Sequence, residues 1–231
     1  QARNARLVPR RQPMRVKEIF ATMQGEGSKA GSPAVFVRFA GCNLWSGHES
    51  TRAKSKGVCG DWCDTDFATG DKHSPASVVR SVVALSDSWS SPVAVLTGGE
   101  PLLQLRLPDG SELVDRLRHA GVEIHVETNG TIDDEVLDYC DHITVSPKRL
   151  RKDAADPLGH IVRRRGTDLK VVDSQWTLQQ LHAMGEWDFA HRFIQACDTP
   201  STPARDVSGV LTLAAALGFR VSVQSHKLVG L

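Results

Sequence analysis

The stretch PVAVLTGGEPLLQLRLPDGSELVDRLRHAGVEIHVETNG, residues 92–130, places an amphipathic pattern between two apolar runs. Residues 92–99 predict a buried strand that ends in glycines. Residues 110–121 predict an amphipathic helix that Gly121 can terminate, and residues 122–130 predict the next strand. A strand, a helix and another strand in this order are typical of a parallel sheet, so the stretch indicates an α/β fold.

The same strand–helix rhythm extends along the chain in both directions. Upstream, residues 33–41 predict a buried strand, and residues 74–85 predict a helix with Ser74 as its cap and Pro75 at its first position. Downstream, the patterns predict a short helix at 133–140, strands at 142–148 and 168–172, a helix at 175–184, an extended segment at 188–196, a helix within 204–218 that Gly218 ends, and a strand at 219–227. The rhythm predicts one α/β domain over residues 14–231, with a mostly parallel sheet that is either open or part of a barrel.

The composition limits the class of protein. The chain has 231 residues, of which 40% are apolar and 24% charged, values that are typical of a soluble globular protein. The net charge of +1 argues against nucleic acid or an anionic membrane as the main partner, and no apolar run reaches the roughly 18 residues needed to span a bilayer. Residues 1–13 are basic but lack the apolar stretch of a signal peptide, which predicts a disordered arm; a nucleic-acid or targeting role is the alternative.

Polar and glycine-containing motifs follow the predicted strands at one end. They are TGGEP at 97–101, ETNG at 127–130, SPK at 146–148, QSH at 224–226 and the cysteine loop that follows the first predicted strand. In parallel α/β folds the loops that follow the strands carry the ligands. The order of the motifs therefore predicts that five loops converge on one ligand-binding edge of the sheet.

Three of the five cysteines lie within 22 residues, and they are Cys42, Cys59 and Cys63. An odd number of cysteines with uneven spacing argues against a disulfide framework, so we expect a reducing cytoplasm and thiols that are available for a metal. The residues alone leave three interpretations open: a structural zinc site completed by His48, an iron–sulfur cluster with one iron free of protein ligands, or thiols without a metal. Cys140 and Cys197 are predicted to be buried core thiols.

The sequence around the three cysteines resembles a known class of enzymes. GCNLWSG at 41–47 and CGDWCDTDF at 59–67 are similar to the cluster loop of the radical S-adenosylmethionine enzymes, and TGGEP is similar to their motif for the methionine amine of the cofactor. EIFATMQGEG at 18–27, VFVRFAGCNLW, ETNG, VSPK and VQSHK narrow the resemblance to the 7-carboxy-7-deazaguanine synthases, from Val16 to Leu231. The resemblance implies a partial, modified (βα)6 barrel of the radical S-adenosylmethionine type.

The cysteine spacing departs from the superfamily in two places. The usual loop has three residues between its first two cysteines, whereas this chain has sixteen between Cys42 and Cys59; a subset of the deazaguanine synthases carries a comparable insert. The family has two residues between its last two cysteines, whereas this chain has three, the last of them Trp62. Trp62 keeps the aromatic position before Cys63, and the extra residue either bulges outward or alters the geometry of the ligands.

The resemblance implies a carbon–nitrogen lyase. A four-iron, four-sulfur cluster on the three cysteines accepts one electron, and S-adenosylmethionine on its open iron is split to methionine and a 5′-deoxyadenosyl radical. The radical abstracts a hydrogen from 6-carboxy-5,6,7,8-tetrahydropterin, whose ring contracts and loses ammonia to give 7-carboxy-7-deazaguanine, an intermediate of queuosine and other 7-deazapurine pathways. The implied partners are a flavodoxin- or ferredoxin-type electron donor and a second copy of the chain, with no membrane and no direct nucleic-acid contact.

The resemblance also assigns site residues, with no catalytic side chain beyond the cluster-bound cofactor. The implied metal ligands are Cys42, Cys59 and Cys63 for the cluster and Thr65 for Mg²⁺. The implied cofactor contacts are Trp62, Asp64, Gly98, Gly99, Glu100, Ser146, Lys148 and Gln224. The implied substrate contacts are Gln24, Glu26, Arg38, Thr97, Gly99, Glu127 and His226.

The residue types suit these tasks. Glu100 is an anion that can accept hydrogen bonds from the methionine ammonium, and the two glycines of TGGEP lack the Cβ that would keep the backbone away from the cofactor. Glu26 and Glu127 can accept hydrogen bonds from the N–H groups of a pterin. Arg38 interrupts an apolar strand, where it either meets the substrate carboxylate or turns outward to solvent.

Two other functions compete with the lyase. A glycyl-radical activating enzyme would keep the cofactor and change the substrate, but QGEG at 24–27 and the long insert argue against it. A zinc-stabilised binding module would use Cys42, Cys59, Cys63 and His48, and the irregular cysteine spacing favours it. The lyase is the prediction that accounts for the largest part of the chain.

Overall fold

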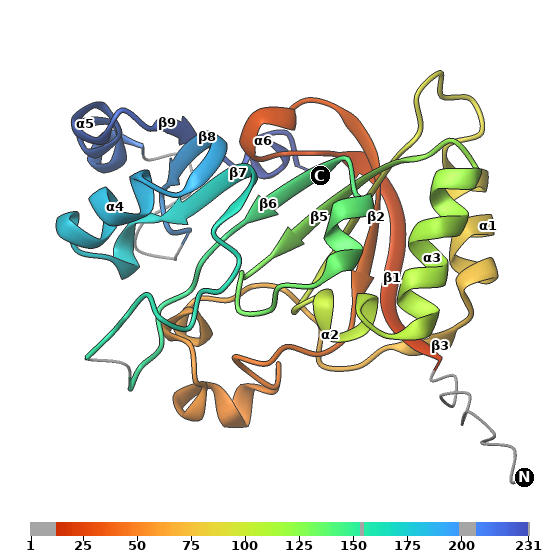
Figure 1. The fold of residues 1–231 in the computed structure, drawn as a ribbon, viewed down its shortest axis with the longest axis horizontal. Helices are drawn as coiled ribbons and strands as arrows, with labels where there is room; N and C mark the ends of the chain where they lie inside the picture. The colour runs from red at the N-terminus through yellow and green to blue at the C-terminus, as the bar shows by residue number, and fades with distance from the viewer. Residues whose placement is uncertain (1–12, 153–154, 199–206, 231) are drawn as a thin grey trace, which may run out of the picture.

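The computed structural model describes residues 13–152, 155–198 and 207–230. Within these ranges, nine strands form one sheet in the order β3-β1-β2-β4-β5-β6-β7-β8-β9 (Figure 1). The strands are β1 (Met14–Met23), β2 (Pro33–Phe39), β3 (Asp71–His73), β4 (Val93–Gly98), β5 (Glu123–Thr128), β6 (His142–Val145), β7 (Arg165–Val172), β8 (Asp188–Gln195) and β9 (Arg220–Ser222). The α-helices are α1 (Pro75–Leu85), α2 (Leu102–Leu105), α3 (Pro108–His119), α4 (Leu178–Gly185), α5 (Ser208–Leu217) and α6 (Ser225–Leu228).

All strand pairs from β2 through β9 are parallel, and β1 joins the sheet antiparallel, between β3 and β2. The edge strands β3 and β9 do not pair with each other in the described chain, so the sheet is open. The structure therefore confirms the predicted α/β class and the mostly parallel sheet. The sequence patterns do not predict β1 and β3, because β1 lacks a regular alternation of buried and exposed residues and β3 has only three residues.

The predicted helix boundaries follow their capping residues. At the start of α1, the Ser74 hydroxyl oxygen accepts a hydrogen bond from Ser77 N at 3.2 Å. After α5, Gly218 has a φ of 69°, the left-handed conformation that glycine adopts at little cost. Residues 204–206 of the predicted helix and residues 1–12 of the predicted arm lie outside the described residues.

Several predicted elements differ in length by a few residues, such as the predicted strand 142–148, which ends at Val145, and two differ more. The predicted strand 219–227 is a strand only in β9, because the Ser225 N–H donates to the Gly25 carbonyl at 3.0 Å and the chain turns away from β8 into α6. The predicted short helix 133–140 is a 3₁₀ helix, η4 (Glu135–Tyr139), for which Asp134 provides the cap. The described parts of the connection from β6 to β7 contain no helix, so the barrel pattern is interrupted there.

One face of the sheet packs into the main core, and the other carries the site together with a small apolar cluster around Val95. Val35, Val37 and Phe39 of β2 are buried on the face that α1 and α3 cover, in the same core as Val82 and Leu117 (Figure 1). Fully burying one such side chain contributes about 1.5–3 kcal/mol. Because alternate residues of a strand point to opposite faces, the residues between them line the other face, which carries the polar side chains of the site.

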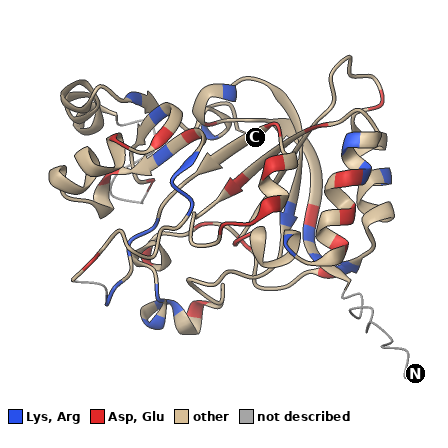
Figure 2. Cartoon of the chain, in the orientation of Figure 1, with Lys and Arg blue, Asp and Glu red and all other residues tan. Residues whose placement is uncertain are grey.

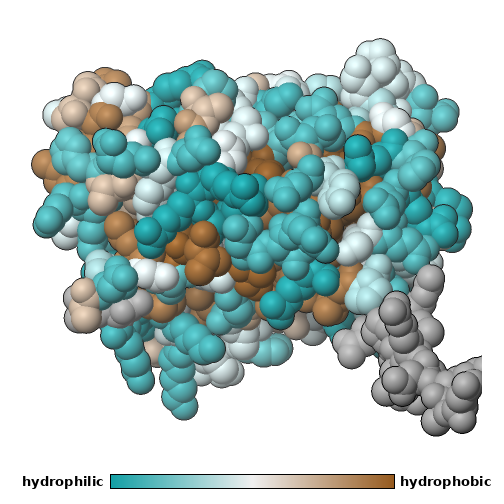
Figure 3. Space-filling model, in the orientation of Figure 1, coloured by the Kyte–Doolittle hydropathy of each residue, from teal (hydrophilic) through white to brown (hydrophobic). Residues whose placement is uncertain are grey.

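Charged and polar side chains cover much of the outer surface. Acidic and basic residues lie along α3, whereas α1 carries Arg80 as its single charged residue (Figure 2). Hydrophilic residues cover most of the face in Figure 3, with smaller apolar areas between them. Among the described residues, none of the helices combines the length and the apolar composition needed to cross a bilayer.

Candidate active site

A cavity of about 620 Å³ opens at the carboxyl ends of the parallel strands. A cavity of this volume suits a cofactor-sized or drug-sized ligand. The predicted site residues that line it are Gln24, Glu26, Arg38, Cys42, Cys59, Trp62, Cys63, Asp64, Thr65, Thr97, Gly98, Gly99, Glu127, Ser146, Lys148, Gln224 and His226. Of the predicted site residues, Glu100 alone does not line the cavity.

All three cysteines of the cluster loop border this cavity, and none of them forms a disulfide. The segment between Cys59 and Cys63 winds into the 3₁₀ helix η3 (Val58–Asp61), and the Cys63 N–H donates to the Cys59 carbonyl at 2.8 Å. Residues four apart on a helical turn project from the same side. The extra residue therefore completes a closed turn, and both thiols border the cavity.

The protein environment acts on the protonation of these thiols. Burial raises the pKa of Cys42, and it raises the pKa of Cys59 to about 12 against the opposing positive charge of Lys148. A reactive free thiol instead has a lowered pKa. Metal binding needs deprotonated thiols and supplies the positive charge that stabilises them. The raised pKa values of Cys42 and Cys59 therefore argue against nucleophilic thiols, and the position of both thiols at the cavity is what suits metal ligands.

His48, the fourth ligand of the zinc interpretation, lies away from this site. It is exposed and does not border the cavity. Within the described ranges, no group of three His, Cys, Asp or Glu side chains is arranged around a single metal ion. In a cubane each thiolate binds a different iron, so the three cysteines need not converge on one point. The geometry therefore disfavours zinc and fits a cluster.

The Glu100 carboxylate is fully buried behind the cavity, at 0% exposure. Its Oε1 accepts hydrogen bonds from Leu102 N at 3.1 Å and Thr128 Oγ1 at 2.8 Å, and its Oε2 accepts one from Asn129 N at 2.8 Å. In this structure Glu100 therefore does not border the cavity, and protein donors fill about three of its four acceptor positions. Glu100 instead ties the TGGEP loop to the ETNG loop.

Replacing Glu100 by glutamine is expected to destabilise the fold. The amide turns one acceptor into a donor that faces protein donors, and a buried polar group left unsatisfied costs about 1–3 kcal/mol. Urea unfolding measures this loss. Glu112→Gln, in a surface ion pair with Arg116, is the matched control, with an expected change of about 0.5 kcal/mol or less. An E100Q protein of unchanged stability that loses affinity for S-adenosylmethionine would instead place this carboxylate at the cofactor.

The two glycines of TGGEP permit a close approach between loops. Gly98 has a φ of 135°, and a Cβ there would lie 2.2 Å from the Phe39 carbonyl oxygen. A Cβ on Gly99 would lie 2.2 Å from the Gly41 carbonyl oxygen and 2.8 Å from Cβ of Cys42. The glycines therefore seat this loop against the cysteine loop, and both also border the cavity.

Glu127 presents a carboxylate at the cavity wall between two polar neighbours. Gln24 Nε2 donates to its Oε1 at 2.9 Å, and Thr97 Oγ1 donates to its Oε2 at 3.1 Å. These side chains come from β5, from the loop after β1 and from β4, so the fold brings together residues that are far apart in sequence. A carboxylate has about four acceptor positions, which leaves capacity for the donors of a ligand.

Arg38 lies on the cavity side of β2, and its side chain is only 21% exposed. Its Nε donates to Glu18 Oε1 at 2.6 Å, and its guanidinium carbon lies 5.8 Å from the centre of the Phe20 ring. A guanidinium has about five N–H donors, so the Glu18 contact leaves others for a ligand carboxylate. Arg38 therefore does not turn outward to solvent, which was one of the two alternatives that the sequence left open.

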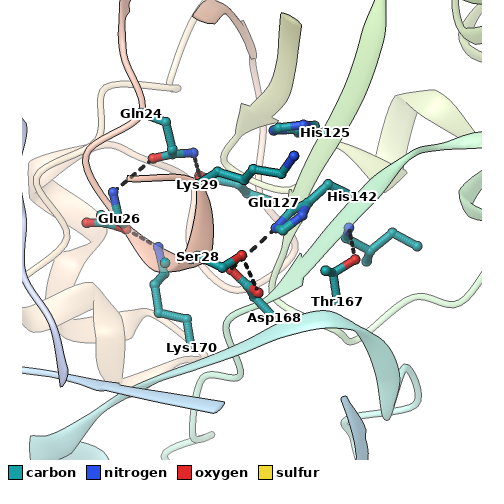
Figure 4. Close-up of polar contacts among 12 residues, drawn as sticks. Gln24, Glu26, Ser28, Lys29, His125, Glu127, His142, Thr167, Asp168 and Lys170 are labelled. Atoms are coloured by element: carbon teal, nitrogen blue, oxygen red, sulfur yellow. Dashed lines mark hydrogen bonds and ion pairs between the residues drawn. The ribbon is translucent and has the colours of Figure 1, made fainter. Parts of the chain in front are cut away.

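The sequence patterns do not predict an ion pair between Glu26 and Lys170. Lys170 lies in β7, 144 residues from Glu26, and borders the same cavity (Figure 4). Burial raises the pKa of Glu26, but the Lys170 charge and hydrogen bonds from Lys170, Gln195 and Gln224 lower it to about 2. The only sequence signal is a lysine inside an apolar run, because a buried charge needs a partner.

The C-terminal helix α6 closes one side of the cavity. The Lys227 ammonium donates to Asp64 Oδ2 at 2.7 Å and to Asp198 Oδ2 at 2.5 Å. His226 packs against Gly25, where a Cβ would lie 1.9 Å from the imidazole Nδ1. The predicted residues Asp64 and His226 therefore lie at the same rim, although they come from opposite ends of the chain.

The fold and the site together define a class of protein. An open, mostly parallel α/β sheet with three free cysteines and a glycine-rich loop around one cavity is the architecture of a radical S-adenosylmethionine enzyme. The crystal structure of QueE from Escherichia coli has the same fold, with a TM-score of 0.62 over 92% of this chain and 94% of that chain, at 21% sequence identity.

Sequence relatives narrow this class to one family. A 7-carboxy-7-deazaguanine synthase from Burkholderia multivorans is 42% identical over 225 residues, which cover 94% of this chain and 98% of that protein. Another, from Caulobacter vibrioides, is 40% identical over 230 residues with the same coverage of 94% and 98%. No protein-family model matches the chain. The chain belongs to the 7-carboxy-7-deazaguanine synthase family.

Proposed function

We propose that the chain converts 6-carboxy-5,6,7,8-tetrahydropterin to 7-carboxy-7-deazaguanine with loss of ammonia, a carbon–nitrogen lyase reaction. The observation that carries the proposal is the single cavity of about 620 Å³ that the cysteines, the proposed cofactor contacts other than Glu100 and the proposed pterin contacts all line. The relatives that share the chain's full-length pattern carry the name of this activity.

The three cysteines fit a four-iron, four-sulfur cluster with one iron left open. When bound there together with S-adenosylmethionine, the cluster supplies the one-electron chemistry of the reaction. Cys42 arrives from the loop after β2, while Cys59 and Cys63 share one helical turn, so the chain offers thiolates from two sides. The nearby Lys148 charge favours the thiolate form of Cys59.

We assign the wall next to the cysteines to S-adenosylmethionine. The Lys148 ammonium donates to the Ser146 carbonyl at 2.9 Å and to its Oγ at 2.5 Å, and lies 6.0 Å from the centre of the Trp62 ring. A cation and a hydroxyl held in this way suit the carboxylate and the ribose hydroxyls of the cofactor. Asp64 and Gln224 complete this wall, and Gly98 and Gly99 supply its backbone.

We assign the adjoining part of the cavity to the pterin. The Glu127 carboxylate, held by Gln24 and Thr97, is the proposed acceptor for adjacent N–H groups of the ring, with Glu26 beside it. Arg38 is the proposed partner of the substrate carboxylate, because it presents unpaired N–H donors to the cavity. His226 lies at the rim, where it contributes to enclosing the substrate.

The proposal extends to a metal ion and to partners. Thr65 is the proposed protein ligand of Mg²⁺, which prefers oxygen ligands and often bridges to substrate, and it borders the cavity close to Cys63. The proposed electron donor is a flavodoxin- or ferredoxin-type protein, and the proposed assembly is a homodimer. We infer a cytoplasmic location, because the free thiols suit a reducing compartment.

Anaerobic incubation of the reconstituted protein with S-adenosylmethionine, a reductant and the carboxypterin tests the proposed reaction. We expect the pterin to be consumed, with release of ammonia and a product of the mass of 7-carboxy-7-deazaguanine. Cleavage of the cofactor with the pterin unchanged would contradict the substrate assignment. That outcome would favour another radical enzyme, such as a glycyl-radical activating enzyme.

A further inference from the structure

Two side chains of strand β7 hold the loop that carries Glu26. Asp168 and Lys170 lie two residues apart in β7, so their side chains share the cavity-facing side of the sheet. Asp168 accepts hydrogen bonds from Ser28 N and Ser28 Oγ, each at 2.8 Å, and Lys170 pairs with Glu26 (Figure 4). Two neighbouring β7 side chains thus hold two alternate residues of the loop from Gln24 to Lys29.

The backbone conformation of this loop depends on its contacts with β7. Gly27, between the two held residues, has a φ of 69°, and a Cβ there would lie 2.6 Å from Asp168 Oδ2. His142 Nε2 lies 3.3 Å from the same oxygen, which fixes the carboxylate from the other side. The Glu26 N–H in turn donates to Gln24 Oε1 at 3.1 Å. The loop therefore has one backbone path that places Glu26 at the cavity.

Lys170 is a buried cation among three carboxylates. It is 6% exposed, and the charges of Glu26, Glu127 and Asp168 all raise its pKa against the effect of burial. Buried carboxylates that share a site repel one another, and at least one of them takes up a proton unless a cation lies between them. Lys170 therefore allows Glu26 and Glu127 to face the same cavity as anions.

The hydrogen bonds to Glu26 leave part of its carboxylate available to accept one more. Gln195 Nε2 and Gln224 Nε2 donate to Oε1 at 3.0 Å and 2.8 Å, and Lys170 donates to Oε2. A carboxylate accepts about four hydrogen bonds, so about one acceptor position remains, and it belongs to the oxygen that Lys170 holds. The orientation of that position is set by the Lys170 ammonium.

We propose that Lys170 is a positioning residue for substrate: it holds the Glu26 carboxylate as an anionic acceptor aimed at an N–H group of the pterin, while Asp168 holds the same loop through Ser28. The inference rests on the proposed function, and it adds the residue that sets the charge and direction of one substrate contact. Lys170 itself makes no step of the reaction.

The charged and polar side chains around Glu26 determine how this positioning role of Lys170 depends on pH. Lys170 faces it from β7, Gln195 from β8 and Gln224 from the segment before α6, and the charge of Lys148 acts from the loop after β6. Without the Lys170 charge, burial is the largest influence left, and it raises the pKa of Glu26. A raised pKa means that Glu26 takes up a proton as the pH falls, and a protonated Glu26 loses acceptor strength.

The probe is 6-carboxypterin, the oxidised analogue of the proposed substrate. Its titration into the cluster-loaded protein, by anaerobic calorimetry from about pH 6 to about pH 9, tests the proposal. In Lys170→Met, binding at low pH is expected to weaken at least about tenfold, the equivalent of one charge-assisted hydrogen bond, and to recover as the pH rises. The wild-type protein keeps the same affinity, since its Glu26 has a pKa of about 2. Lys29→Met is the matched control: Lys29 lies in the same loop, pairs with Glu123 at 2.9 Å and does not border the cavity.

Two further variants keep the test decisive if Lys170→Met folds poorly. Lys170→Arg retains the cation and is expected to keep an affinity that does not change with pH. Glu26→Gln/Lys170→Met removes the buried pair together and is expected to fold but to bind weakly at every pH. Wild-type affinity in Lys170→Met or in the double variant would overturn the proposal. A loss in the single variant Lys170→Met that is equal at all pH values would overturn it too. Absence of 6-carboxypterin binding to the wild-type protein would instead count against the proposed function.

Discussion

A Cys59→Ala protein is expected to hold almost no iron after anaerobic reconstitution and to leave S-adenosylmethionine uncleaved. Cys59 and Cys63 share one helical turn, and removing either thiol leaves too few ligands for a four-iron cluster. Because the lost group is a metal ligand, the expected effect is complete and not a partial change in affinity. Iron and sulfide per chain measure the cluster, and release of 5′-deoxyadenosine measures cleavage.

Cys140→Ala is the matched control for this experiment. Cys140 lies at the end of η4, does not border the cavity, and its Sγ donates to the Val136 carbonyl at 3.5 Å. Cys140 is half-buried at the margin of the core and not fully buried as predicted, and burial raises its pKa to about 12, which argues against a reactive thiol. We expect unchanged iron content. Normal iron in Cys59→Ala, or reduced iron in Cys140→Ala, would contradict the assignment of the ligands.

Arg38→Ala is expected to lower kcat/KM for the carboxypterin by about 10- to 100-fold, with uncoupled cleavage of the cofactor largely retained. The range corresponds to the loss of one hydrogen-bonded charge pair, about 1.5–3 kcal/mol. Arg38 borders the cavity from β2 and is anchored by Glu18, so its removal leaves the cysteine loop intact. Steady-state kinetics with and without the pterin separate the two activities.

An exposed arginine in α1 provides the control for Arg38. Arg80→Ala, on the outer surface, is expected to leave both activities unchanged. If Arg38→Ala reduces pterin turnover and uncoupled cofactor cleavage equally, Arg38 serves the fold or the cofactor and not the substrate. If it reduces neither, the substrate carboxylate has another partner.

Most of the sheet could be predicted because its strands are local patterns. Buried parallel strands such as β2 and β4 are short apolar runs bounded by turns. The start of α1 is marked in the sequence by its capping residue, Ser74. The edge of the sheet was harder to predict, since β1 pairs with β2 on one side and with β3 on the other, and its residues have intermediate burial. The end of β9 depends on Ser225 reaching Gly25, a contact that no local pattern encodes.

The site residues also divide into those that local motifs indicate and those whose role depends on contacts far along the chain. The order of the motifs predicted that their loops meet at one edge, and the family resemblance supplied the seventeen predicted residues that border the cavity. The contact of Glu100 with the cofactor ammonium stays a prediction, and in this structure the Glu100 carboxylate accepts hydrogen bonds from Thr128 and Asn129. Lys170 escaped prediction because its role depends on Glu26, 144 residues away.

The spacing of the last two cysteines was an open question that only the backbone answers. One extra residue between Cys59 and Cys63 either spoils a ligand set or completes a turn, and the difference depends on hydrogen bonding. The Cys63 N–H and the Trp62 N–H both donate to the Cys59 carbonyl, at 2.8 Å and 3.1 Å. The turn is therefore closed, and both thiols remain at the cavity.

The most direct test of a three-cysteine cluster with one open iron is the electron paramagnetic resonance spectrum of the reduced protein, recorded before and after S-adenosylmethionine is added. We expect a cluster signal that changes when the cofactor binds the open iron, and chemical analysis that gives about four irons and four sulfides per chain. A colourless protein with one zinc per chain, or a cluster signal that the cofactor leaves unchanged, would contradict it.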